Sequence, residues 1–404
     1  MRVRFTAVTL LGVVALAGCV AGPPPEIATP APELPPAFLY APAASEVATV
    51  EALLPRDDPA FAALSTQLLA QSPTLGEALA RIDRARAEAA RAGANRLPSV
   101  SGGASVEATR INPNQFGGDA PPGAPGGFSI DAEQVSYGAT LSASWDADLF
   151  GRLRARERAA VALADASSAD AAAVRIALLS ELAGAVIDWR TLQDREAALR
   201  EDLAAAQRLV DLSASRERTG LSPGFDRLRA ESSAAATRTR LSALDNERAR
   251  IVGRIVTLTA QGAREVTGTL ALGSPTSDAP GAVAATPSQL LANRPDVQAA
   301  SSRLAASDAQ LAAAAAERFP QLTLSAALGL LAFDLGDLFD EDAIVGSLAA
   351  GLAAPLLDFG RVEAGIDAAA ADKRAAFQNY RGAVFTALGE AETAYALIAA
   401  TDAE

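Results

Sequence analysis

The stretch Leu290-Leu291-Ala292-Asn293-Arg294-Pro295 repeats an earlier one, Leu68-Leu69-Ala70-Gln71-Ser72-Pro73, at a distance of 222 residues. The likeness continues at the same distance, since Pro98 returns as Pro320. A period this long far exceeds the roughly 20–50 residues of solenoid repeats, so each copy must contain several helices or strands. The sequence therefore predicts an internally duplicated fold with pseudo-symmetry.

The second half of each copy carries matching landmarks as well. Phe150-Gly151-Arg152 returns as Phe359-Gly360-Arg361 and Glu181 returns as Glu390, both 209 residues later, because the connecting segment is shorter. After Glu181 the first copy continues with helix-like sequence to Gln261, whereas only fourteen residues follow Glu390. We therefore expect the second copy to lack a final helical hairpin.

The N-terminus resembles a bacterial lipoprotein signal. Two arginines precede an apolar run at residues 5–15, which is shorter than the ~20 residues of a membrane-spanning helix. The run leads into Leu16-Ala17-Gly18-Cys19, which is similar to the lipobox, where cleavage leaves the cysteine as a lipid-carrying N-terminus. We predict a signal peptide at residues 1–18 and lipid on Cys19. An ordinary signal peptide with a chance cysteine is the alternative.

Residues 19–64 are predicted to form a lipid-anchored tether that leads into the first helix. The segment is rich in Pro and Ala, a composition that is not expected to pack a core. Val20 follows the cysteine, whereas an Asp at that position favours retention of bacterial lipoproteins in the inner membrane. We therefore predict anchorage in the outer membrane, with the chain extending into the periplasm.

The composition argues against several classes of function. With 35 basic and 48 acidic residues the net charge is −13, and no cluster of Lys and Arg indicates a nucleic-acid partner. The chain has no histidine, which removes Ser-His-Asp triads, HExxH zinc sites and most general-base chemistry. Glycosidases work with two carboxylates alone, but no pair of Asp or Glu stands out here. We predict no enzymatic activity, no cofactor and no metal.

Residues 152–218 contain no proline and carry apolar residues at alternating steps of three and four. This heptad stripe predicts a coiled-coil helix of ~100 Å. Glu196 interrupts the stripe, whose members are Leu178, Leu182, Ala185, Trp189, Leu192, Leu199, Leu203, Ala206 and Val210. Shorter helices with a break near Ala166 are the alternative. Two glycines and a proline between residues 219 and 224 then predict a tight reversal of the chain. A second apolar stripe follows, interrupted only by Arg248, so residues 152–261 are predicted to form a helical hairpin.

Outside these helices the pattern changes to strict alternation. The alternation predicts two β-hairpins, each with apolar residues on one face, at residues 99–146 and 321–356. Each strand has about ten residues, the length of a membrane-spanning β-strand. Four strands cannot close a barrel, since bacterial outer-membrane barrels need at least about eight and lipid does not tolerate open edges. Several chains must therefore share one barrel; a soluble sheet with one wet face is the alternative.

Leu290 to Gly329, with the sequence LLANRPDVQAASSRLAASDAQLAAAAAERFPQLTLSAALG, is similar to the second-copy signature of the TolC/OprM outer membrane factors, and in particular to NodT-type lipoproteins. The resemblance extends over nearly the whole chain. Asp57-Asp58-Pro59-Ala60-Phe61 matches the segment that leads into the first helix. Phe150-Gly151 and Phe359-Gly360 match the two strand-to-helix turns.

The resemblance implies a mainly α fold with membrane β. Three chains would share one barrel of twelve strands, which continues as a tunnel of long antiparallel helical hairpins. Such a homotrimer is the passive exit duct of a tripartite efflux system for drugs or other small molecules, in which a periplasmic adaptor links the duct to an inner-membrane RND pump. By the same resemblance the adaptor contacts the hairpin tip, which comprises Arg218, Thr219, Gly220, Leu221 and Ser222; a plain turn is the alternative.

The predicted structural repeats are residues 65–278 and residues 285–404, the second ending in a helix at residues 360–400. Members of the family complete a second long hairpin, with the residues that gate the tunnel, after the positions that match 390–400. This chain shows no counterpart to them. A truncated, non-conducting lipoprotein of the outer membrane or periplasm is therefore the alternative to an efflux duct. An adaptor protein and an enzymatic lipoprotein fit the sequence less well.

Overall fold

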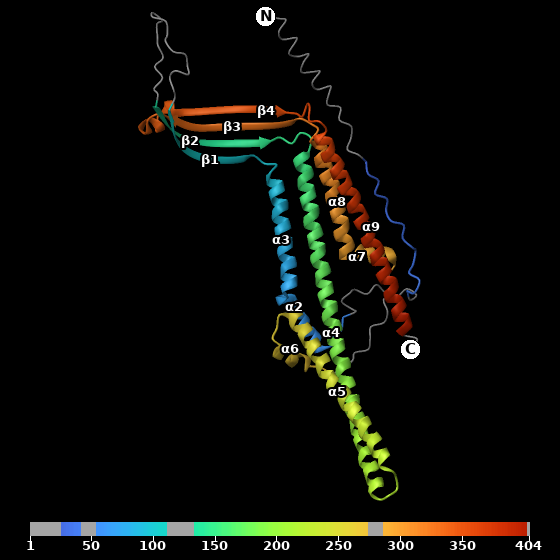
Figure 1. Ribbon diagram of the computed structural model, residues 1–404. Helices are drawn as coiled ribbons and strands as arrows, with labels where there is room; N and C mark the ends of the chain where they lie inside the picture. The colour runs from blue at the N-terminus through green and yellow to red at the C-terminus, as the bar shows by residue number, and fades with distance from the viewer. Residues whose placement is uncertain (1–25, 42–53, 111–132, 274–285, 402–404) are drawn as a thin grey trace, which may run out of the picture. The chain divides into compact units, whose positions relative to one another are not determined.

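The computed structural model describes residues 26–41, 54–110, 133–273 and 286–401 (Figure 1). Their contacts separate them into two compact units, each assembled from parts of both sequence copies. The first unit contains residues 26–29, 86–163 and 303–377, and the second contains residues 30–85, 164–302 and 378–401. The first unit carries the β-sheet, and the second carries the largest hydrophobic core.

Two helices open the first copy. α2 spans Pro59–Gln71 and begins at a strong start signal, because proline occupies its first position and Asp58 accepts hydrogen bonds from the backbone N–H groups of Ala60 and Phe61. Its apolar face is buried in the second unit. α3 follows directly as Pro73–Ala94.

A single helix, α4, runs without a break from Arg152 to Arg218. The alternative break near Ala166 is not found, because the helix is continuous there, and Ser168 donates its hydroxyl to the Ala164 carbonyl one turn earlier. α5 (Gly224–Thr259) returns antiparallel to it after a sharp turn, which Figure 1 shows at the free end of the hairpin. The predicted apolar stripes form the core between them, and Leu182 and Ile255 are fully buried.

The two residues that interrupt these stripes pair with each other. The Arg248 guanidinium on α5 lies 2.5 Å from the Glu196 carboxylate on α4. Glu196 also accepts from Arg200, and Arg248 also donates to Asp245. Both side chains therefore belong to one ionic network between the helices, and neither leaves an unpaired charge in the apolar stripes.

A short helix that the sequence analysis did not predict, α6 (Ala263–Leu270), folds back onto this core. It begins after Gly262, whose N–H donates to Glu265, a local start signal. Its buried face consists of Val266 and Leu270, neither of which has any exposed surface. With only two apolar anchors in eight residues, its periodicity is too short to recognise in the sequence.

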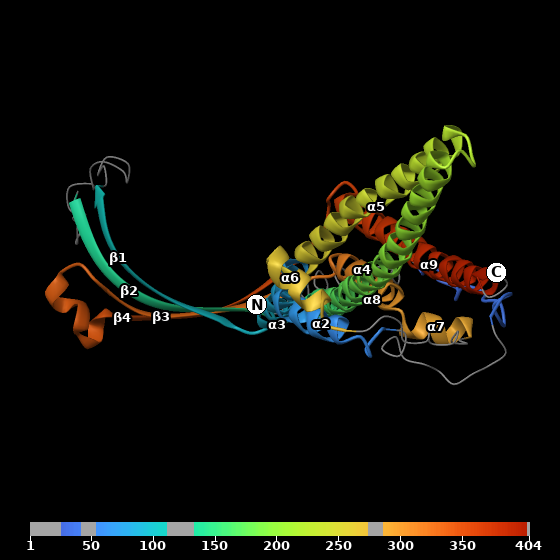
Figure 2. The ribbon, with the colours of Figure 1, turned by 90° about the horizontal axis from the view of Figure 1, so that it is seen from below.

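Four strands form one antiparallel sheet in the order β1-β2-β3-β4, comprising Ser99–Arg110, Glu133–Asp146, Gln321–Ala332 and Ile344–Ala353. β1 pairs with β2 inside the first copy and β3 pairs with β4 inside the second. The pairing of β2 with β3 joins the two copies. Figure 2 shows that the sheet is curved, most strongly along β1 and β2. Two 3₁₀ turns, Leu335–Phe339 and Glu341–Ala343, connect β3 to β4.

The helices of the second copy are α7 (Pro287–Asn293), α8 (Pro295–Ala316) and α9 (Arg361–Thr401). In the first unit α8 and α9 pack through Leu311 and Ile366, and Lys373 pairs with Asp308 at 2.6 Å. Among the described helices α9 alone is long and apolar enough to cross a membrane by composition. The predicted fold class, long antiparallel helices with a small antiparallel sheet, is confirmed.

One expectation about the tether was wrong. The Pro- and Ala-rich segment was expected to pack no core, yet Phe38 is only 5% exposed and lies against α7, α8 and α9 in the second unit. Its ring is 5.4 Å from that of Tyr395, and the N–H of Leu39 donates to the Glu392 carboxylate. Leu34 and Ala41 pack partly against the same cluster, and neighbouring prolines restrict the chain and so reduce the entropy lost on docking.

Candidate functional site

The sheet separates its residues into one apolar and one polar face. Leu141 of β2 lies opposite Leu328 of β3, and the row continues on both sides into Gly102 and Gly346. Seven large side chains of this face are more than half exposed, namely Val100, Val106, Leu141, Leu328, Ile344, Leu348 and Leu352. An apolar surface of this extent needs cover by lipid or by another chain.

The opposite face of the sheet carries small and hydroxyl-bearing residues. Ser101 and Ser142 lie opposite each other with their hydroxyl oxygens 2.9 Å apart, and Ser99 donates to the Ser144 carbonyl. The row extends through Ala327 to Ser347 on β4. Apolar residues on one face and small polar residues on the other are typical of a membrane β-barrel with a wet lumen.

Both edges of the sheet are open in the described part of the chain. β1 and β4 each pair on one side only, and every residue of both strands is exposed. Unpaired backbone groups cannot be solvated inside lipid, where each costs several kcal/mol. A single chain with this sheet is therefore incomplete as a membrane structure.

The predicted strand-to-helix turns lie at the end of the sheet where α4 and α9 begin. Phe150 stacks on Phe319, with ring centroids 4.7 Å apart and planes at 13°. Gly151 and Gly360 have φ angles of +76° and +87°, which favour glycine and explain why both turns carry it. Phe359 also has a positive φ of 52°, and its side chain is 92% exposed.

The predicted tip residues form the reversal between α4 and α5. Arg218 ends α4, and the N–H groups of Gly220 and Leu221 donate to the Glu217 and Arg216 carbonyls, which closes the turn. Leu221 is 79% exposed and Phe225, at the start of α5, is 68% exposed. The tip therefore presents apolar side chains beside an ion pair between Arg227 and Glu217.

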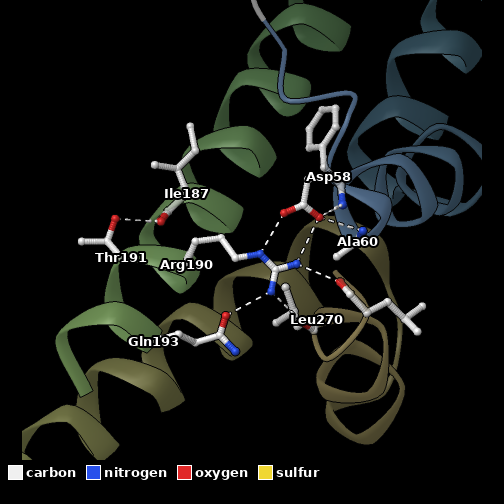
Figure 3. A network of polar contacts seen from close by, with 9 residues as sticks. Asp58, Ala60, Ile187, Arg190, Thr191, Gln193 and Leu270 are labelled. Atoms are coloured by element: carbon white, nitrogen blue, oxygen red, sulfur yellow. Dashed lines mark hydrogen bonds and ion pairs between the residues drawn. The ribbon is translucent and has the colours of Figure 1, made fainter. Parts of the chain in front are cut away.

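A buried ionic network in the second unit was not predicted from the sequence (Figure 3). Arg190 on α4 is 7% exposed at its side chain and makes a bidentate ion pair with Asp58, at 2.8 and 3.1 Å. Its other donors reach the Leu270 and Leu272 carbonyls and the Gln193 side chain. All five N–H donors of the guanidinium thus have an acceptor.

This network joins three elements, since Asp58 also caps α2 and the two carbonyls end α6. Burial alone would raise the pKa of the Asp58 carboxyl, but the Arg190 guanidinium and the N–H groups of Phe61 and Ala60 outweigh it and hold that pKa below its usual value. From the sequence, Asp57-Asp58-Pro59 was matched only to the segment that leads into the first helix, and its role as a cap was not predicted. Nothing in the sequence identified Arg190 as its partner.

The second copy contains a related clamp around the Arg294-Pro295-Asp296 motif. Arg294 binds Asp296 through two hydrogen bonds of 3.0 and 2.7 Å and reaches Glu390 on α9 at 2.6 Å. The Arg294 side chain lowers the pKa of Asp296, although burial opposes the effect. The motif therefore fixes the start of α8 against α9.

Cys19 and the signal sequence lie outside the described residues, so the lipidation site stays a prediction. Within the part of the chain that is described, no group of three or more Cys, Asp or Glu side chains could hold a metal ion. The groups with displaced pKa values belong to caps and ion pairs of the scaffold.

Comparison with known proteins identifies the architecture. The profile described as outer membrane efflux protein matches residues 64–261 and 286–404. The chain belongs to the outer membrane efflux protein family. The pyoverdine export outer membrane protein OpmQ of Pseudomonas aeruginosa is 31% identical to this chain over 340 residues, which cover 83% of this chain and 69% of the relative. Nodulation protein T of Rhizobium leguminosarum bv. viciae is 27% identical over 339 residues, covering 81% and 64%.

Solved structures agree with this assignment. The outer-membrane channel OprN is 30% identical and superposes with a TM-score of 0.80, covering 93% of this chain and 82% of OprN. CusC, at 22% identity and a TM-score of 0.77, shows the same fold. The predicted family and outer-membrane location are thereby confirmed. The family consists of channel proteins.

Proposed function

We propose that this protein is the outer-membrane channel component of a tripartite efflux system of the RND type, a passive exit duct for drugs or other small molecules. The observation that carries the proposal is the four-stranded sheet, with one apolar face and two open edges. Lipid covers the apolar face, and further copies complete the edges. The family assignment and the long helical hairpin support the same role.

The family assignment supports a homotrimer as the proposed assembly, in which three copies supply twelve strands and close one barrel. The small hydroxyl-bearing residues on the polar face then line the lumen. Energy enters at the pump, so the duct needs no catalytic residue, cofactor or metal of its own. OpmQ is named for pyoverdine export, which fits a duct for small molecules.

The adaptor is proposed to dock at the tip formed by residues 218–222. Leu221 and Phe225 provide the exposed apolar contacts, and the hydrogen-bonded turn holds them in place. Lipid on Cys19 and a signal peptide at residues 1–18 are proposed to anchor the protein in the outer membrane. The repeat boundaries 65–278 and 285–404 belong to the same proposal.

Efflux from living cells tests this role. A bacterium deleted for its own outer-membrane efflux channels would express the protein together with an RND pump and adaptor from the protein's own source. We expect faster efflux of a fluorescent pump substrate than in the deletion strain. Leu221→Asp with Phe225→Asp serves as a matched variant, which should reach the outer membrane but lose efflux. Normal trimers in the outer membrane without any efflux would contradict the proposal.

A further inference from the structure

The two copies of the duplication pair their strands in the same register. Val100 of β1 pairs with Ala143 of β2. The sequence repeat, at distances of 222 and 209 residues, gives Leu322 of β3 and Leu352 of β4 as their counterparts. These two residues also pair with each other. The repeat therefore holds residue by residue through both hairpins.

The pairing between β2 and β3 is the contact of the first copy with the second. Ala143 of β2 pairs there with Ala326 of β3. The counterpart of Ala143 is Leu352 on β4, and the counterpart of Ala326, 222 residues earlier, is Ala104 on β1. Because β1 and β4 form opposite edges of the same sheet (Figure 1), the β1 that meets β4 belongs to another copy of the chain.

We infer that β4 of one copy pairs antiparallel with β1 of a second copy in one fixed register, in which Leu352 lies opposite Ala104. Gly346–Ala353 then faces Arg110–Gly103 in reverse order, along most of the length of both strands. The inference rests on the proposed function, which supplies the oligomer, and it adds the residues that form the seam. The seam satisfies both open edges at once, because each copy donates one β1 and one β4.

The alternation of side chains agrees with this register. The apolar faces of the two strands become continuous, with Leu348, Ala350 and Leu352 opposite Ala108, Val106 and Ala104. On the other face Ser347 meets Thr109 and Gly351 meets Ser105. A slip by one residue would place the exposed leucines against the polar face. The repeat geometry, found without reference to polarity, thus reproduces the polarity of both faces.

The turns beside the sheet support the same seam. The stack of Phe150 on Phe319 also joins the two copies within one chain. Its counterparts are Phe359 and Leu97, both of them apolar and, in the single chain, 92% and 67% exposed. A second copy in the inferred register brings its Leu97 to the side of Phe359. The contact then covers a large aromatic side chain that the single chain leaves in solvent.

Cysteine cross-linking in isolated outer membranes tests the register. Directly opposite residues have Cβ atoms about 4.5–5.5 Å apart, whereas diagonal neighbours two positions away are about 7–8 Å apart and cross-link poorly. The variants carry Leu352→Cys with Ala104→Cys, or Gly351→Cys with Ser105→Cys, so that both pairing types of an antiparallel ladder are sampled. Slipped controls combine Leu352→Cys with Gly102→Cys or with Val106→Cys. Each variant with only one of the new cysteines serves as a control, because any cross-link that it forms involves Cys19 or two copies of the same new cysteine.

We expect at least one of the in-register pairs to form several-fold more disulfide-linked dimers and trimers on non-reducing gels than either slipped pair. Stronger cross-links in a slipped pair, or trimers on sizing without cross-links in any pair, would overturn the register while leaving the proposed duct intact. A monomer on sizing with no cross-links would overturn the register together with the proposed trimer.

Discussion

At the scale of single residues, the fold depends on a few polar groups that hold helix ends in place. Arg190 is the clearest case, because five acceptors from three segments converge on one buried guanidinium. Removing a partner leaves a buried charge unpaired, which costs more than an exposed ion pair contributes. Asp58 is the most sensitive position, since it neutralises Arg190 and also caps α2.

We expect Asp58→Asn to destabilise the second unit by about 2 kcal/mol, because the amide keeps the hydrogen-bonding shape but not the charge. In the folded protein the pKa of Asp58 lies below its ordinary value of 3.8. The carboxylate therefore contributes stability above about pH 4 and loses it as the pH falls through the folded pKa. Urea unfolding in detergent, followed by the fluorescence of the neighbouring Trp189, measures the difference from wild type at each pH.

The control for this prediction is Glu77→Gln, which breaks an ion pair with Arg81 whose side chains are 63% and 73% exposed. An exposed pair of this kind contributes less than about 0.5 kcal/mol, so the control should unfold like wild type. Equal losses in the two variants, or an Asp58→Asn deficit that persists unchanged at pH 3, would contradict the role assigned to Asp58.

Gly273 shows how closely the backbone approaches this network. Its φ is +117°, and a Cβ there would lie 2.9 Å from an Arg190 nitrogen and 3.0 Å from the Pro59 side chain. Gly273→Ala should therefore lower the urea midpoint through backbone strain and displacement of Arg190. Gly268→Ala is the matched control, since its Cβ meets nothing within 4 Å and alanine favours helix α6. Similar midpoints for the two variants would argue against the close approach.

At the scale of elements, Glu196 and Arg248 interrupt the apolar stripes of α4 and α5 and form an ion pair between the two helices. Substituting them tests whether the hairpin depends on this polar contact. Arg248→Leu alone should destabilise the hairpin by about 1 kcal/mol, because Glu196, whose side chain is only 15% exposed, loses its interhelical partner. Adding Glu196→Leu should restore most of that loss by completing the apolar stripe. Thermal loss of helical circular dichroism reports both steps. A double variant less stable than the single one would show that the ion pair itself holds the hairpin.

Elements with many periods were predictable from the sequence, and elements with few were not. The heptad stripe of α4 repeats over most of 67 residues and the strands alternate for ten or more, so both patterns stand above chance. α6 rests on Val266 and Leu270 alone, and the docked tether rests on Phe38. Arg190 was missed for another reason: a buried cation is identified by partners distant in sequence, and the apolar stripe beside it gave no sign of them.

At the scale of the whole molecule, the duplication is what turns one sheet into part of a closed surface. The two hairpins are equivalent in register, so the contact between copies inside a chain defines the contact between chains. A chain without the repeat would need two unrelated edges to match. Here the two edge strands, β1 and β4, are repeat counterparts of β3 and β2, which pair with each other inside the chain. The edges of two copies therefore match, and four strands can form part of a larger closed barrel.

The lipid-facing side of that barrel is open to a direct test at adjacent positions of β4. Leu348 lies on the apolar face and is 85% exposed, whereas Ser347 lies on the polar face. Arginine on a lipid-facing strand position costs roughly 2–4 kcal/mol near the bilayer midplane, while a water-filled lumen accepts the charge. Leu348→Arg should therefore reduce the amount of folded trimer in outer-membrane fractions several-fold, and Ser347→Arg should not. The reverse ranking, or no difference, would mean that lipid does not cover the apolar face.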